Sequence, residues 1–92
     1  MAMKPVDRLL ATARAEIGYI EKETNAHLDD KTANAGDGNW NKYARDLDAL
    51  GVVYNSKKNG YAWCDIFTDW CFIQTFGLEL GLQLLCQAKK GV

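Results

Sequence analysis

The chain has 92 residues and a mass of 10.3 kDa, enough for one domain with a small hydrophobic core. Hydrophobic residues make up 48% of the chain and charged residues 25%, a balance typical of globular proteins and not of disordered ones. Eleven Lys and Arg against twelve Asp and Glu leave no basic excess for nucleic acid, and no apolar run reaches the roughly 18 residues of a membrane span.

The first predicted element is an amphipathic helix from about Pro5 to Ile17. Pro5 suits the first position of a helix, where its missing N–H has no role. Gly18 is expected to end the helix. Asp7 and Arg8 interrupt the N-terminal apolar residues, so no signal peptide is expected. The apolar positions recur at helical spacing: Val6, Leu9, Leu10, Ala13 and Ile17.

Residues 24–39 keep no hydrophobic period and are predicted to form a long loop, of a length that is often functional. Three acidic residues in it are candidate oxygen ligands for calcium: Asp29, Asp30 and Asp37. Their spacing does not match an EF-hand loop, and a solvated loop is the favoured interpretation. No cofactor is therefore expected.

A second helix is predicted from Asn39, as its N-terminal cap, to Gly51, its C-terminal stop. Residues 52–54 are predicted to form a short extended run, and residues 55–60 a turn. The apolar face of this helix would comprise Trp40, Tyr43, Ala44, Leu47 and Leu50.

Six of the ten aromatic residues fall between Tyr61 and Phe76. Most of this stretch is predicted to be a helix that Cys64 opens and Gly77 ends. A fourth helix is predicted from Leu78 to Cys86. An aromatic helix is normally buried on several sides, so we expect a partner or a further part of the domain to cover it. One face of the helix comprises Trp63, Ile66, Phe67, Trp70 and Ile73.

Three cysteines, an odd number with no CxxC spacing, argue against a disulfide framework and against a zinc site. A thiol in the first helical turn, as expected for Cys64, lies at the positive end of the macrodipole, which favours the nucleophilic thiolate. The first-turn N–H groups can also donate to an oxyanion. The alternative is that Cys64 is a small buried hydrophobe. Cys71 is expected in the core, and Cys86 either in the core or paired outside this chain.

The only histidine, His27, is the only candidate base for Cys64. It lies in the polar loop, where an exposed position without a catalytic role is the favoured interpretation. Asp65 and Asp69 lie one turn apart on the predicted aromatic helix. Stabilising the first turn of that helix is a sufficient role for Asp65.

Four segments resemble the N-terminal half of CHAP domains, the cysteine, histidine-dependent amidohydrolases and peptidases of phage endolysins and bacterial cell-wall hydrolases. The segments are Glu16-Ile17-Gly18-Tyr19, Asn39-Trp40-Asn41-Lys42-Tyr43-Ala44, Asn59-Gly60-Tyr61-Ala62-Trp63-Cys64-Asp65-Ile66-Phe67 and Asp69-Trp70-Cys71.

The resemblance implies that Cys64 is the nucleophile and attacks an amide in the peptide part of peptidoglycan. It places Tyr61, Trp63 and Asp65 in the substrate-binding or oxyanion region. The family's histidine and its orienting polar residue follow the nucleophile, on strands of an antiparallel sheet. No histidine follows Cys64 among these 92 residues.

The expected fold is therefore mainly α, with three to four helices. Residues 1–92 would be one incomplete domain, the helical front half of an α+β papain-like domain whose antiparallel sheet is absent. The expected function is that of a peptidoglycan amidase or endopeptidase, inactive alone without its base. It would act at the bacterial cell wall and reach it by phage-type release or by another route.

Two alternatives remain from the residues themselves. The chain could be a small helical interaction or regulatory module, which self-associates or binds a partner through an exposed aromatic face. It could also be a plain four-helix domain with an inert buried cysteine.

Overall fold

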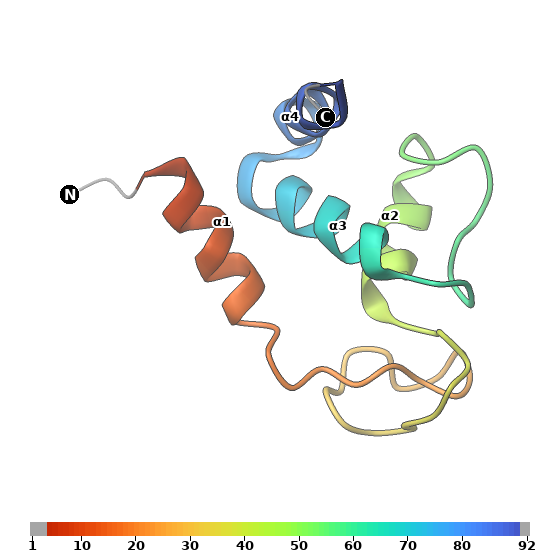
Figure 1. Cartoon of the computed structure of the whole chain (residues 1–92). Coiled ribbons are helices and arrows are strands. Elements are labelled where there is room, and N and C mark those ends of the chain that lie inside the picture. Colours follow the sequence, from red (N-terminus) through yellow and green to blue (C-terminus); the bar gives the residue numbers. More distant parts are fainter. Residues whose placement is uncertain (1–3, 91–92) are drawn as a thin grey trace. The chain divides into compact units, whose positions relative to one another are not determined.

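A computed structural model describes residues 4–90, with side chains as far as Cys86 (Figure 1). This range holds four helices: α1 (Pro5–Arg14), α2 (Lys42–Leu50), α3 (Cys64–Phe76) and α4 (Leu78–Lys90). It contains no strand, only isolated β-bridges from Lys22 to Ala35 and Trp40. The predicted mainly α architecture is confirmed. Within residues 4–90 no helix is both long and apolar enough to cross a bilayer.

The chain forms two structural units, whose boundary falls within α3. The first unit consists of Met1–Ile17 and Thr68–Val92, and the second of Gly18–Phe67. Cys64 and both longer segments of the cell-wall hydrolase resemblance belong to the second unit.

In the first unit, α1 is shorter than its apolar pattern predicts. Pro5 occupies the first turn as expected, but the helix ends at Arg14 rather than near Ile17. The N–H groups of Glu16 and Ile17 donate to carbonyls three residues back, those of Ala13 and Arg14. The last turn is therefore tightened into a 3₁₀-type turn, and the apolar period outlasts the α-helix.

Polar contacts connect α1 with α3. The hydroxyls of Thr12 and Thr75 are hydrogen-bonded at 2.7 Å. The Arg8 guanidinium donates to the Thr75 carbonyl at 2.9 Å and lies 5.4 Å from the centre of the Phe76 ring. No residue of α1 is buried, and Val6 and Leu10 are exposed.

The buried core of the first unit comes from α3 and α4. Gly77 lies between the two helices with a positive φ of 87°. This left-handed conformation ends α3, as predicted for a glycine at this position. Gly81 lies directly against the backbone of Ile73, where a Cβ would be only 3.0 Å from the Ile73 Cα. Close approach of the two helices thus depends on Gly81. The buried apolar residues of this unit are Trp70, Cys71, Ile73 and Leu85.

In the second unit, α2 begins two residues later than predicted. The side chain of Asn41 caps it by accepting a hydrogen bond from the Ala44 N–H at 2.8 Å. Asn39 precedes the helix with a φ of 61°. The backbone of Trp40 cannot join the helix because its N–H and carbonyl pair with Lys22, at 3.2 and 2.7 Å.

The end of α2 follows the prediction, and the segment after it does not. Gly51 ends the helix in the left-handed region, with a φ of 73°. Val52 and Val53 form bends and Tyr54 is irregular, so the predicted extended run of residues 52–54 is wrong. Of the predicted apolar face, Tyr43, Ala44 and Leu47 are buried, whereas Leu50 is exposed.

The predicted loop of residues 24–39 is confirmed, and it folds back on residues 20–23. The N–H groups of Ile20 and Glu23 donate to the carbonyls of Lys31 and Asn34. Gly38 passes so close to the Glu23 backbone that a Cβ there would collide with it. The loop also buries a residue of its own, Leu28, which is 7% exposed. It is therefore an ordered, packed loop.

Candidate functional site

Cys64 is the first residue of α3 and its side chain is exposed. The carbonyl of the preceding residue, Trp63, accepts the Phe67 N–H at 2.9 Å and so begins the helical hydrogen-bonding pattern. Asp65 is also exposed in this first turn. The structure thus places a solvent-facing thiol at the positive end of a 13-residue helix. The alternative interpretation of Cys64 as a buried hydrophobe is wrong.

The other two cysteines lie in different surroundings. Cys71 is buried, as predicted, and burial together with the charge of Glu16 raises the pKa of its thiol to about 11. Cys86 is exposed on α4, so the prediction of a core position for it is wrong. All three cysteines are thiols, which makes Cys86 an internal reference for an exposed helical thiol away from a helix start.

A cluster of aromatic rings lies behind Cys64. Tyr43 of α2 is at its centre and is 1% exposed. Its ring lies 4.8 Å from Tyr19, 5.7 Å from Trp63 and 4.8 Å from Phe67, measured between ring centres. Trp63 precedes Cys64 in the chain and Phe67 follows it by one turn, so the cluster packs residues on either side of Cys64 in sequence. We call Tyr19, Tyr43, Trp63 and Phe67 the aromatic cluster.

The Tyr19 hydroxyl connects the aromatic cluster to the loop and to α2. It donates to the Leu28 carbonyl at 2.6 Å and accepts from the Lys42 N–H at 2.9 Å. The Lys22 ammonium lies 4.9 Å from the centre of the Tyr19 ring. Lys22 is fully buried, and its Nζ has no hydrogen-bond acceptor among the described residues. The electron-rich face of the Tyr19 ring makes a favourable cation–π contact with the Lys22 ammonium.

Hydrogen bonds connect the loop that leads to Cys64 with α2. The carboxylate of Asp48 accepts hydrogen bonds from the N–H groups of Lys58 and Asn59 at 2.9–3.0 Å. Gly60, with a φ of 95°, lies against the Trp40 indole, and a Cβ there would be 3.2 Å from the ring. The two longer segments of the resemblance, which begin at Asn39 and Asn59, are thereby brought together.

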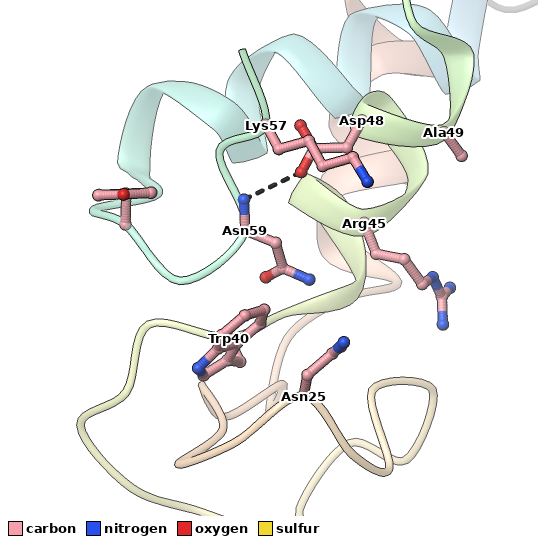
Figure 2. A pocket seen from close by; sticks show the side chains of 8 residues that line it. Asn25, Trp40, Arg45, Asp48, Ala49, Lys57 and Asn59 are labelled. Atoms are coloured by element: carbon pink, nitrogen blue, oxygen red, sulfur yellow. Dashed lines mark hydrogen bonds between the residues drawn. The ribbon is translucent and has the colours of Figure 1, made fainter.

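An open pocket of about 760 Å³ lies beside this loop (Figure 2). Asn59 and Tyr61, from the Asn59-Gly60-Tyr61 stretch, both lie in its wall. The side-chain amides of Asn25 and Asn59 point into the hollow in Figure 2. The pocket is lined by Asn25, Trp40, Arg45, Asp48, Ala49, Lys57, Asn59 and Tyr61. No local sequence pattern joins Asn25, Arg45, Asp48 and Lys57, so the sequence did not predict these lining residues.

The predicted calcium candidates have separate partners. Asp29 pairs with the Arg45 guanidinium at 2.7 Å, and this hydrogen bond holds the pKa of Asp29 below its ordinary value. The N–H groups of Thr32 and Ala33 donate to Asp30 and lower its pKa in the same way. Asp37 is exposed. Within residues 4–90 no three His, Cys, Asp or Glu residues form a metal-binding group.

His27 lies in the exposed part of the loop. Its φ of 56° is left-handed, and its carbonyl accepts the Asp30 N–H at 3.2 Å. This backbone role is structural, and it leaves the imidazole on the outside of the loop.

The aromatic face proposed for an interaction module is not exposed. Ile66, Trp70 and Ile73 are buried, and Trp63 and Phe67 are half-buried. Among the described residues, the exposed large apolar side chains lie outside α3: Val6, Leu10, Ile17, Ile20, Leu50, Val52, Tyr61 and Leu80.

Comparison of the chain with family models, with curated proteins and with solved structures gives no significant match to any of them.

Proposed function

We propose that this chain carries the nucleophile of a CHAP-like peptidoglycan hydrolase, an amidase or endopeptidase that acts at the bacterial cell wall. The observation that carries the proposal is the position of Cys64, exposed and first in α3. Cys64 also follows a loop that Asp48 fastens to α2. An exposed thiol on a rigid support at a helix start is the arrangement that cysteine hydrolases require.

The chemistry follows from this position. The Cys64 thiolate attacks the carbonyl carbon of the scissile amide and forms a C–S bond, while the C–N bond breaks and the departing nitrogen takes up a proton. Water then hydrolyses the thioester to a carboxylic acid and returns the thiol. N–H groups of the first turn of α3 donate to the oxygen that becomes negative at each step. Tyr61 and Trp63, which precede Cys64 by three residues and by one, would border the approach of the substrate.

The base is the second requirement of this chemistry. In the family that the chain resembles it is a histidine after the nucleophile, and the 92 residues contain only His27. We expect residues 1–92 alone to clear suspensions of purified cell walls several orders of magnitude more slowly than a complete cysteine hydrolase. Rapid clearing that Cys64→Ser abolishes would instead locate the base within these residues.

The nucleophile is tested by the rate of alkylation of each thiol with iodoacetamide at pH 7, read by peptide mass spectrometry. We expect Cys64 to react faster than Cys86, since both are exposed but only Cys64 is at a helix start. Cys71 should react slowest because it is buried. Equal rates for Cys64 and Cys86 would show that the helix start does not activate the thiol, and would contradict the proposal.

A further inference from the structure

We infer that the pocket between Trp40 and Tyr61 is a saccharide subsite, which holds a sugar of the glycan strand next to the bond that Cys64 attacks. The lining of the pocket supports saccharide binding by itself. Its assignment to wall glycan, and the choice of bond, rest on the proposed function.

Two aromatic side chains, Trp40 and Tyr61, line the pocket. Tyr61 is 66% exposed, and its side chain has neither a ring partner nor a hydrogen-bond partner among the described residues. The half-buried Trp40 indole is held in place by its contact with Gly60. Aromatic rings bordering an open pocket offer apolar faces that suit the C–H faces of a pyranose ring.

Two neutral side-chain amides, those of Asn25 and Asn59, also line the pocket. The amide oxygen of Asn59 already accepts the Asn41 N–H at 3.0 Å, so its NH₂ group remains to donate. The side-chain amide of Asn25 faces the same hollow (Figure 2) and can both donate and accept. Neutral amides that converge on one space match the hydroxyl and acetamido groups of an amino sugar.

The charged groups of the lining offer an anionic ligand no bidentate partner. Arg45 is held by two carboxylates, those of Asp29 at 2.7 Å and Asp46 at 2.9 Å. The Asp48 carboxylate is occupied by backbone N–H groups. Lys57 is then the one cation of the lining without an acid partner among the described residues, and it is exposed. A free carboxylate of a peptide would find no bidentate partner here, whereas a neutral sugar needs none.

The position of the pocket relative to Cys64 indicates which peptidoglycan bond is cut. Tyr61 is three residues before Cys64, and three residues span at most about 11 Å. A sugar that stacks on Tyr61 would therefore carry the first bonds of its attached peptide within reach of Cys64. In peptidoglycan the amide nearest to the glycan joins the lactyl group of the muramic acid to the first amino acid of the peptide. Hydrolysis there consumes one water and releases the lactyl acid and the peptide amine, which makes the activity that of an amidase.

The test uses the full chain with Cys64→Ser, which prevents turnover, and NMR titration with chitotetraose, the N-acetylglucosamine tetramer. We expect it to shift the Trp40 indole N–H and the Tyr61 ring signals. Tyr61→Ala should weaken binding about tenfold, the loss expected for one stacked ring, and Tyr61→Phe should preserve it. Val52→Ala, an equally exposed site outside the pocket, is the matched control and should have no effect.

Two outcomes would overturn the inference. One is an absence of pocket shifts with chitotetraose. The other is that the dipeptide L-alanyl-D-isoglutamine shifts the same signals more strongly, which would assign the pocket to the peptide. Failure of the proposed function has a different signature, equal alkylation of Cys64 and Cys86 with saccharide binding intact.

Discussion

The side-chain oxygen of Asn59 accepts a hydrogen bond from the backbone N–H of Asn41 at 3.0 Å, although 18 residues separate the two in sequence. Asn41 caps α2, and Asn59 begins the stretch that ends at Cys64. One hydrogen bond thus joins the start of one helix to the loop that leads to the start of another. The position of the thiol depends on this junction and on Asp48, which fastens the same loop from the next turns of α2.

Asp48→Ala should destabilise the second unit by about 1–3 kcal/mol, because it leaves the N–H groups of Lys58 and Asn59 without their acceptor. The free energy of unfolding from urea titration measures this loss. Asp46→Ala on the same helix is the control. It removes a partly exposed ion pair with Arg45 and should cost less than about 1 kcal/mol. Equal losses in the two variants would show that Asp48 does not hold the loop.

Lys22→Met should leave the free energy of unfolding unchanged or raise it by about 1 kcal/mol. Met keeps the length of the side chain and removes a buried charge that has no hydrogen-bond acceptor among the described residues. Lys22→Ala should lower the free energy of unfolding by about 2–4 kcal/mol, because it opens a cavity. If Met destabilises the protein as much as Ala, then the contact of the ammonium with the Tyr19 ring outweighs the burial of the charge.

Cys71 should make the protein less stable at alkaline pH. Burial raises the pKa of its thiol in the folded chain from 9.0 to about 11, so the unfolded chain loses this proton first. The stabilisation is complete below pH 9 and disappears as the pH rises toward 11. Thermal unfolding between pH 8 and 11 should therefore show a smaller alkaline decrease in Cys71→Ala than in the unmodified chain. Parallel curves would contradict this role.

Arg45→Gln should raise the pKa of Asp29 toward its ordinary value and leave that of Asp30 unchanged. The Arg45 guanidinium lowers the pKa of Asp29, whereas backbone N–H groups of Thr32 and Ala33 lower that of Asp30. Asp29 thus stabilises the fold above the ordinary aspartate pKa, and this contribution is lost as the pH falls through the lowered value. NMR titration of the two carboxyl carbons measures both groups at once, and equal shifts would show that the pair is not specific.

The sequence by itself determined the local elements. Apolar residues at helical spacing predicted all four helices, and glycines marked the ends of α2 and α3 at Gly51 and Gly77. The position of Cys64 at the start of a helix could also be predicted from the sequence. Turn residues lie just before Cys64, and aromatic residues at helical spacing lie just after it. Such features depend on neighbours in sequence, and their free energy is local.

Only the tertiary structure decided which polar groups meet. Asn41 rather than Asn39 caps α2 because the Trp40 backbone pairs with Lys22, 18 residues away in sequence. The burial of Lys22 and the joining of Asn25, Arg45 and Asn59 around one pocket likewise depend on the packing of a loop that has no period of its own. These hydrogen bonds and contacts form between distant residues, so no spacing in the sequence encodes them.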